Sequence, residues 1–412
     1  MMKPSVNPTE HPDPPDSRAV SVPNEERSDT SQGRGSADPA SEGAGGGGRP
    51  ATRKAGPMGR TVDFDTAPLV LIWEVTQACG LACRHCRAAA VPQRHPDELD
   101  TEEAMALLDD AAEFGDGQLV VFSGGDPLRR DDLAELIRYG TDRGLRIAVT
   151  PSGTRSLTRD RVAELADAGM ARMAVSLDGA TRESHDAFRG EESFADTIAA
   201  AEAAQECGVP VQVNTTVCAD TVEELPAIRE LVGELGVVLW SVFFLVRVGR
   251  GGVLTPISPK RAEGIMEWLH DVDAEEPFGV KTTEAPFYRR VGIQREDGGR
   301  EGSRRRAGIT AGCGFAFVSH VGEVYPSGFL PRSAGNVRES SVVDIYRESD
   351  LFRSLRDPDG FNGKCGACEF RHVCGGSRSR AYAETGDPTG SDPLCPYVPD
   401  GYEGPLPERI AD

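Results

Sequence analysis

Between residues 69 and 244 the sequence alternates between apolar runs rich in β-branched residues and amphipathic stretches with apolar residues at helical spacing. Asp100 and Thr158 are predicted helix N-caps, and a glycine closes each amphipathic stretch. Strands that alternate with helices predict an α/β fold with a parallel sheet and outer helices. Because the repeats are short, a partial barrel is favoured over a flat sheet. The expected strands are 69–75, 119–122, 146–149, 173–177, 211–217 and 237–244, and the expected helices are 101–114, 131–143, 159–168, 181–206 and 221–235.

Small and polar residues follow five of these strands directly, in loops that begin at Thr76, Ser123, Thr150, Ser176 and Asn214. In barrels of parallel strands, the loops after the strands carry the functional groups. Any one of these loops is explained by a simple turn, but five in register predict a rim that binds a polar ligand.

The remaining segments suggest a modular organisation. Residues 1–60 are rich in Pro, Ser, Gly and acidic residues and are expected to be a disordered extension, with Met58 as an alternative translation start. Residues 65–248 form the expected barrel domain. Residues 249–312 are interpreted as an irregular, charged linker, and residues 313–400 as a small cysteine-rich domain.

The composition argues against two classes of partner. The formal net charge is -21 and the pI is about 4.8, which disfavours binding to nucleic acid or an anionic membrane. There are 40 arginines and only 5 lysines, a bias typical either of proteins adapted to high salt or of a GC-rich genome. The sequence shows no signal peptide and no membrane-length apolar stretch, so we expect a cytoplasmic protein with reduced thiols.

Three cysteines follow the first expected strand with the spacing C-x3-C-x2-C: Cys79, Cys83 and Cys86. Three thiolates in one loop can hold three irons of a [4Fe–4S] cube and leave the fourth iron open to a small molecule. A structural zinc site would need a fourth ligand, for which His85 is the nearby candidate.

This motif, at this place in a βα repeat, resembles the radical S-adenosylmethionine (SAM) superfamily. The resemblance implies a partial (β/α)6 barrel, a SAM-binding [4Fe–4S] cluster on Cys79, Cys83 and Cys86, and a reductant such as ferredoxin or flavodoxin. It implies that reductive cleavage of SAM yields a 5′-deoxyadenosyl radical, which abstracts a hydrogen from the substrate. The residues it implies for SAM binding are His85 near the adenine, Ser123, Gly124, Gly125 and Asp126 near the amino group, Ser176 and Asp178 near the ribose, and Arg189 near the carboxylate, with Ser152 and Asn214 in the adjoining rim loops.

A second group of cysteines resembles the SPASM extension of this superfamily: Cys365, Cys368, Cys374 and Cys395. The resemblance implies an auxiliary [4Fe–4S] cluster with four thiolate ligands, and a four-cysteine zinc site is the alternative. Ser327 and Ser377 stand where another auxiliary cluster would have cysteines, which leaves Cys313 alone, so one auxiliary cluster is expected rather than two. Cys207 and Cys218 are expected to be buried small apolar residues.

Around these cysteines stand the runs 328–331, 335–338, 378–383 and 392–395. With them, residues 65–400 resemble enzymes of alternative heme and heme d1 biosynthesis, so a tetrapyrrole is the favoured small-molecule substrate. The implied reaction class is oxidative decarboxylation of propionate side chains. Arg247, Arg289 and Arg290 are candidate partners for substrate carboxylates. The alternatives are a maturase that modifies a short ribosomally made peptide and a non-catalytic iron–sulfur redox module.

Overall fold

The computed structural model describes residues 63–190, 192–295 and 308–408. The expectations for residues 1–60 and for Met58 lie outside these ranges. One ten-stranded sheet runs through the described chain in the order β10-β9-β8-β1-β2-β3-β4-β5-β6-β7. All six strands predicted from the sequence are present and parallel, in sequential order, which confirms the α/β class. Their bounds are β1 Val70–Glu74, β2 Leu119–Ser123, β3 Arg146–Val149, β4 Arg172–Ser176, β5 Val211–Val217 and β6 Leu239–Phe244.

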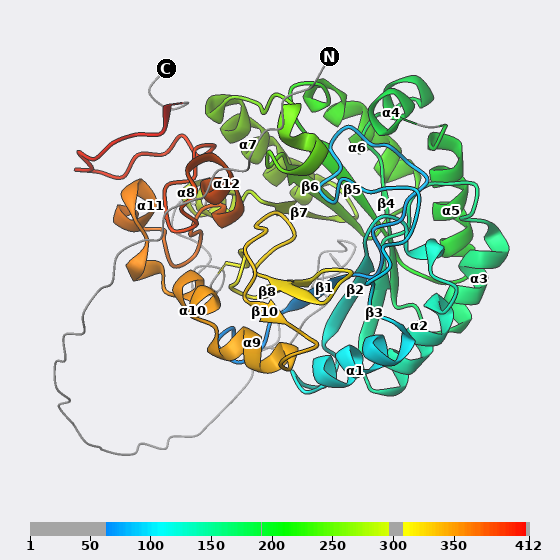
Figure 1. The fold of residues 1–412 in the computed structure, drawn as a ribbon. Helices are drawn as coiled ribbons and strands as arrows, with labels where there is room; N and C mark the ends of the chain where they lie inside the picture. Colours follow the sequence, from blue (N-terminus) through cyan, green and yellow to red (C-terminus); the bar gives the residue numbers. More distant parts are fainter. Residues whose placement is uncertain (1–62, 191, 296–307, 409–412) are drawn as a thin grey trace, which may run out of the picture. The chain divides into compact units, whose positions relative to one another are not determined.

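Helices connect these strands and lie around the outside of the sheet (Figure 1). Asp100 caps α1 through a capping box with Glu103, as the sequence predicts. The five predicted stop glycines all have positive φ, a conformation that glycine adopts without strain. The bounds are α1 Thr101–Ala112, α2 Leu133–Asp142, α3 Arg159–Asp167, α4 Arg182–Arg189, α5 Phe194–Glu206 and α6 Leu225–Glu234, with single 3-10 turns at Pro127–Arg129, Val222–Glu224 and Gly249–Val253.

The prediction of one long helix over 181–206 is wrong. Gly190 ends α4 with φ of 89°, and α5 begins four residues later. Between them, the carboxylate of Asp186 accepts the N–H groups of Ser193 and Phe194 at 2.9 and 2.8 Å. The carboxylate therefore replaces the helical carbonyl partners that these two amides would otherwise have.

The interpretation of residues 249–312 as irregular is also wrong where they are described. They contain α7 (Pro259–Glu275), β7 (Gly279–Thr283) and α8 (Tyr288–Arg295), and β7 extends the parallel sheet beside β6. Strand β7 is short and half polar, so it has no apolar run from which it could be predicted. The run 304–306 lies outside the described residues, and the domain boundaries stay predictions.

The C-terminal segment joins the same sheet. Strand β8 pairs in parallel with β1, and β9 and β10 follow antiparallel. Because β1 carries the first cysteine loop, this pairing attaches the C-terminal segment directly to the strand that presents that loop. The bounds are β8 Phe315–Val318, β9 Glu323–Tyr325, β10 Gly335–Asn336, α9 Val342–Glu348, α10 Asp350–Arg356, α11 Gly363–Ala367 and α12 Arg378–Thr385, with a 3-10 turn at Pro358–Gly360.

The two faces of the sheet differ in chemistry. One set of alternate residues, such as Trp73, Val175, Val213 and Trp240, is fully buried in the core shared with the helices. The opposite face carries polar residues mainly on β4 to β7, such as Ser176, Asn214, Ser241 and Lys281. The sheet therefore has an apolar outer face under the helices and a polar inner face. None of the helices in the described ranges is long and apolar enough to cross a bilayer.

Arg130 fixes the end of β1. Its side chain is 1% exposed, and it donates to the carbonyl oxygens of Val75 and Leu99 at 3.2 and 2.8 Å. It also pairs with Asp132 at 2.6 Å. The strand end before the first cysteine loop is therefore held to the segment that leads into α1.

Replacing Arg130 with Met should lower the free energy of unfolding by about 3 kcal/mol, because two carbonyls and a carboxylate lose a charged, buried partner. Urea denaturation under anaerobic conditions measures this difference. The matched control is Arg138→Met on the exposed face of α2, which should change the stability little. Equal effects of the two changes would contradict the role given to Arg130.

Candidate functional site

The first cysteine loop lies directly against the loop that follows β2. The N–H of Gly125 donates to Thr76 O at 2.8 Å, and the N–H of Asp126 donates to Ala78 O at 2.7 Å. A Cβ on Gly124 would lie 2.3 Å from Thr76 O, and one on Gly125 would lie 2.3 Å from Ala78 O. Both glycines are needed because backbone packs on backbone here. These two amides thus hold the cysteine loop, and the contact of this segment with SAM stays a prediction.

Asp126 connects three of the predicted rim loops. Its buried carboxylate accepts the Ser152 N–H at 3.2 Å and the Thr154 hydroxyl at 3.3 Å. Ser152 in turn donates to Gly125 O at 2.9 Å and lies 3.4 Å from the sulfur of Cys79. Burial raises the pKa of Asp126, although these donors oppose the shift. The loops after β1, β2 and β3 therefore form one hydrogen-bonded unit around Cys79.

A second group of predicted residues gathers beside Cys83. Arg189 donates to Asp178 at 2.8 Å, and Nε2 of His85 lies 3.7 Å from the same carboxylate. Burial alone would raise the pKa of Asp178, but His85, Arg189 and the Thr216 N–H at 2.7 Å hold it below its usual value. The structure thus places a charged carboxylate–guanidinium pair next to a cysteine of the motif.

Burial shifts the pKa values of the histidine and the cysteines near this pair. Burial lowers the pKa of His85 to about 4, so its imidazole is neutral at pH 7. Burial raises the pKa of Cys79 and Cys83, and Arg189 partly offsets the effect on Cys83. Metal ligands must be thiolates, so a cluster here would bind with loss of protons from these cysteines.

Sequence reasoning missed two residues that shape this loop. The ring of Phe188 stacks on His85 with centroids 4.9 Å apart. Arg250 donates to the carbonyls of Cys83 and Ala90 at 2.9 and 2.8 Å, so it braces the cysteine loop from beyond β6. The glycine-rich sequence around Arg250 was the available signal, because Gly249 leaves no room for a Cβ against Arg87 O.

Three predicted rim residues lie on the strands themselves. Ser123 and Ser176 end β2 and β4, and Ser176 is in register with Asn214 on β5. Asn214 accepts a hydrogen bond from Gln212 at 2.7 Å. All three are half-buried, so they belong to the polar inner face, and their contact with SAM stays a prediction.

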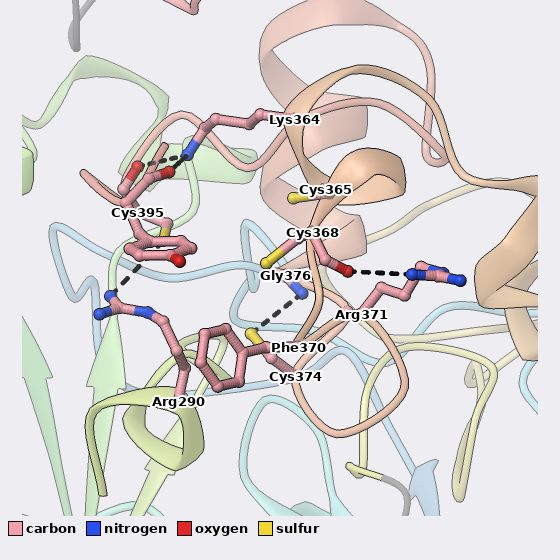
Figure 2. Close-up of a pocket in the computed structure, with 11 residues that line it drawn as sticks. Arg290, Lys364, Cys365, Cys368, Phe370, Arg371, Cys374, Gly376 and Cys395 are labelled. Carbon is pink, nitrogen blue, oxygen red and sulfur yellow. Dashed lines mark hydrogen bonds between the residues drawn. The ribbon is translucent and has the colours of Figure 1, made fainter. Parts of the chain in front are cut away.

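The four C-terminal cysteines line one pocket, although Cys365 and Cys395 are 30 residues apart. Figure 2 shows Cys365, Cys368, Cys374 and Cys395 around it together with Arg290 and Lys364. Cys365 accepts the N–H of Asp392 at 3.3 Å, and Cys374 accepts that of Gly376 at 3.4 Å. Across the described ranges, no three His, Cys, Asp or Glu side chains are close enough to hold a single metal ion. The pocket nevertheless brings together the four thiols that the sequence grouped.

Ser327 and Ser377, which the resemblance places at cysteine positions of another cluster, bind a carboxylate together with Ser379. Ser327 and Ser379 donate to Oε1 of Glu284 at 3.1 and 2.8 Å, and Ser377 donates to Oε2 at 2.5 Å. We call these four residues the Glu284 network. Glu284 directly follows β7, which the sequence did not predict, so the network was not foreseen either. Cys313 lies outside it, and burial raises the pKa of Cys313 to about 11.

The arginines proposed to bind substrate carboxylates lie next to other protein groups. Arg247 pairs with Glu384, Arg290 pairs with Glu263, and Arg289 is close enough to Cys374 for its charge to act on that thiol. The structure therefore does not present Arg247 or Arg290 as free cations for a substrate. Cys218 is buried as expected, whereas Cys207 is only half-buried.

Comparison with known proteins agrees with this architecture. The family model of the radical SAM superfamily matches residues 73–232. The structure of SuiB from Streptococcus suis bound to S-adenosylmethionine superposes with a TM-score of 0.64 over 82% of this chain and 77% of that chain, at 18% identity. SuiB has also been solved with its precursor peptide SuiA. The chain belongs to the radical SAM superfamily and is an iron–sulfur enzyme of that class, which uses a [4Fe–4S] cluster and SAM.

Within the superfamily, the chain is 42% identical to the AdoMet-dependent heme synthase of Methanosarcina barkeri over 82% of this chain and 99% of that relative. It is 31% identical to the Fe-coproporphyrin III synthase of the same organism, over 79% of this chain and 87% of that relative. The match therefore extends well beyond the barrel and includes the C-terminal segment.

Replacing Gly125 with Ala should displace the first cysteine loop, because the new Cβ would fall 2.3 Å from Ala78 O. We expect the anaerobically reconstituted variant to lose about four irons per chain, the content of one cube, while it keeps the iron held elsewhere. The control is Gly264→Ala on α7, where a Cβ meets nothing within 4 Å. Full iron content in the Gly125 variant would contradict the packing argument.

Proposed function

We propose that this enzyme converts propionate side chains of an iron tetrapyrrole to vinyl groups. The observation that carries the proposal is the 42% identity to an AdoMet-dependent heme synthase over 99% of that relative. In the proposed reaction, each propionate loses one hydrogen atom, one electron and CO2, and a vinyl group remains. The likeness to SuiB is one of fold and adds no support for a peptide substrate.

The chain offers cysteines for the groups that this chemistry needs. Cys79, Cys83 and Cys86 would hold the SAM-binding cluster, and the pocket of Cys365, Cys368, Cys374 and Cys395 would hold an auxiliary one. When bound, these groups supply a hydrogen-abstracting radical and a one-electron acceptor. Arg189, fixed by Asp178 beside Cys83, places a buried positive charge where a ligand carboxylate could bind.

A tetrapyrrole with propionates also needs cationic partners in the barrel. Lys281 on β7 and Arg172 on β4 have no ion pair among the described residues. The two strands are separated by β5 and β6, yet Arg172 acts on the pKa of Lys281. Arg172 precedes Ser176 on β4 by four residues, so both side chains point to the same face of the sheet.

The register supports this placement. Ser176, Asn214, Ser241 and Lys281 form one row of paired residues across four neighbouring strands. Residues in one row point to the same face of a sheet. Lys281 therefore shares the polar inner face with the predicted SAM residues Ser176 and Asn214. We infer that Lys281 and Arg172 bind a substrate carboxylate there.

The direct test is to incubate anaerobically reconstituted enzyme with iron coproporphyrin III, SAM and a reductant, and to analyse the tetrapyrrole by mass spectrometry. We expect vinyl products, 5′-deoxyadenosine and about eight irons per chain for two cubes. Cys83→Ala should abolish SAM cleavage and keep the C-terminal iron. SAM cleavage without any vinyl product would refute the substrate, and four irons with one zinc would refute the auxiliary cluster.

The cation pair predicts a pH dependence. Desolvation by the surrounding protein, with a smaller effect of the charge of Arg172, lowers the pKa of Lys281 to about 8. Binding of iron coproporphyrin III, followed by its absorbance without SAM, should therefore weaken as the pH rises through about 8, because the ammonium group loses its proton. Lys281→Arg should remove this pH dependence.

The same binding assay tests each cation separately at pH 7. Lys281→Met and Arg172→Met should each raise the Kd about tenfold, the loss expected for one charge-assisted hydrogen bond. The matched control is Lys260→Met on the exposed face of α7, which should leave the Kd unchanged. Equal Kd values for all three variants would exclude the pair from substrate binding.

A further inference from the structure

A buried arginine reaches the pocket of the four C-terminal cysteines from a distant part of the chain. Arg290 lies on α8, and its side chain is 2% exposed. Its Nη2 lies 3.7 Å from the sulfur of Cys395, a contact drawn in Figure 2. Among the described residues, the other hydrogen bonds from nitrogen to these sulfurs come from neutral backbone amides. Cys395 is therefore the thiol with a charged side-chain donor.

The guanidinium of Arg290 is held in place on several sides. It binds both oxygens of Glu263, with Nη1 to Oε1 at 2.6 Å, and Nη1 also binds Gln294 at 2.6 Å. It lies over the ring of Tyr397, 5.0 Å from the centroid. Such a side chain has little freedom to move away from the sulfur. These contacts fix the position of the guanidinium next to Cys395.

A second buried cation lies next to the same cysteine. Lys364 is 2% exposed, and its Nζ donates to the backbone oxygens of Cys395 and Tyr397, the first at 2.5 Å and the second at 3.2 Å. In the described chain it forms no ion pair with a carboxylate. Burying an ammonium group without an anion is costly. The surroundings of Cys395 are therefore arranged for negative charge, which four thiolates and a cluster would supply.

Positive charge next to a cluster sulfur stabilises the reduced state, because reduction adds one negative charge to the cluster. Hydrogen bonds to the sulfurs and the local charge are known determinants of cluster potential. The acceptor in the proposed decarboxylation takes one electron from the substrate as CO2 leaves, and a higher potential favours that transfer.

We propose that Arg290 is a positioning residue that raises the reduction potential of the auxiliary cluster through Cys395, and that Glu263 limits this effect by partly neutralising it. The inference rests on the proposed function, since it assumes an auxiliary cluster in this pocket. It gives Arg290, which the sequence offered only as a candidate for binding a substrate carboxylate, a different task.

The test is a redox titration, followed by electron paramagnetic resonance, of full-length protein in which Cys79, Cys83 and Cys86 are Ala, so that only the auxiliary cluster is observed. Arg290→Gln should lower the midpoint potential by about 59 mV, a tenfold change in the one-electron equilibrium constant. Glu263→Gln should raise the potential, because the positive charge is then no longer neutralised. Arg295→Gln, on the same helix but exposed and paired with Asp271, should not change it.

The two variants should shift the midpoint potential in opposite directions, which distinguishes an effect of charge from damage to the fold. An unchanged potential in Arg290→Gln, or shifts in the same direction for Arg290→Gln and Glu263→Gln, would overturn the proposal. If Arg290→Gln fails to hold iron, the Glu263→Gln result decides alone: a rise supports the proposal and no rise refutes it. A parent protein that binds zinc instead of iron overturns it as well, whereas the choice of tetrapyrrole substrate does not enter the measurement.

Discussion

The contact between two backbone segments, residues 76–78 and 124–126, is the constraint on which the first site depends. Two amide–carbonyl hydrogen bonds join these segments, and neither Gly124 nor Gly125 has room for a Cβ. The cysteine loop therefore receives its position from the loop after β2 rather than from its own sequence. Asp126 accepts the N–H of Ser152 and so ties the loop after β3 to the same contact. Arg130 binds the carbonyl of Val75 and fixes the end of β1. A change in any of these contacts would alter the geometry of all three thiols together.

Much of this part of the molecule could be predicted from the sequence because its signals are local. Apolar runs, N-caps and stop glycines each depend on a few neighbouring residues, and they located six strands and most helices correctly. The C-x3-C-x2-C spacing identified the family for the same reason. The predicted helix over 181–206 is an exception. Its helical pattern continues across Gly190, but the left-handed backbone of Gly190 ends α4.

The remainder could not be predicted because it depends on contacts between distant residues. Strand β7 has no apolar run and is recognisable only by its pairing with β6. The parallel pairing of β8 with β1 joins segments more than 200 residues apart. Arg290 and Lys281 illustrate the consequence for function: both are ordinary charged residues in the sequence, and only the folded chain places one beside Cys395 and the other on the inner face of the sheet.

The Glu284 network has a consequence for the order in which the protein assembles. Serine hydroxyls and a carboxylate associate as soon as the chain folds, whereas a cluster must be delivered with its iron and sulfide by other proteins. Ser327, Ser377 and Ser379 thus connect the end of β7 with the C-terminal segment before any metal arrives. The junction between the end of β7 and the C-terminal segment therefore does not depend on a bound cofactor.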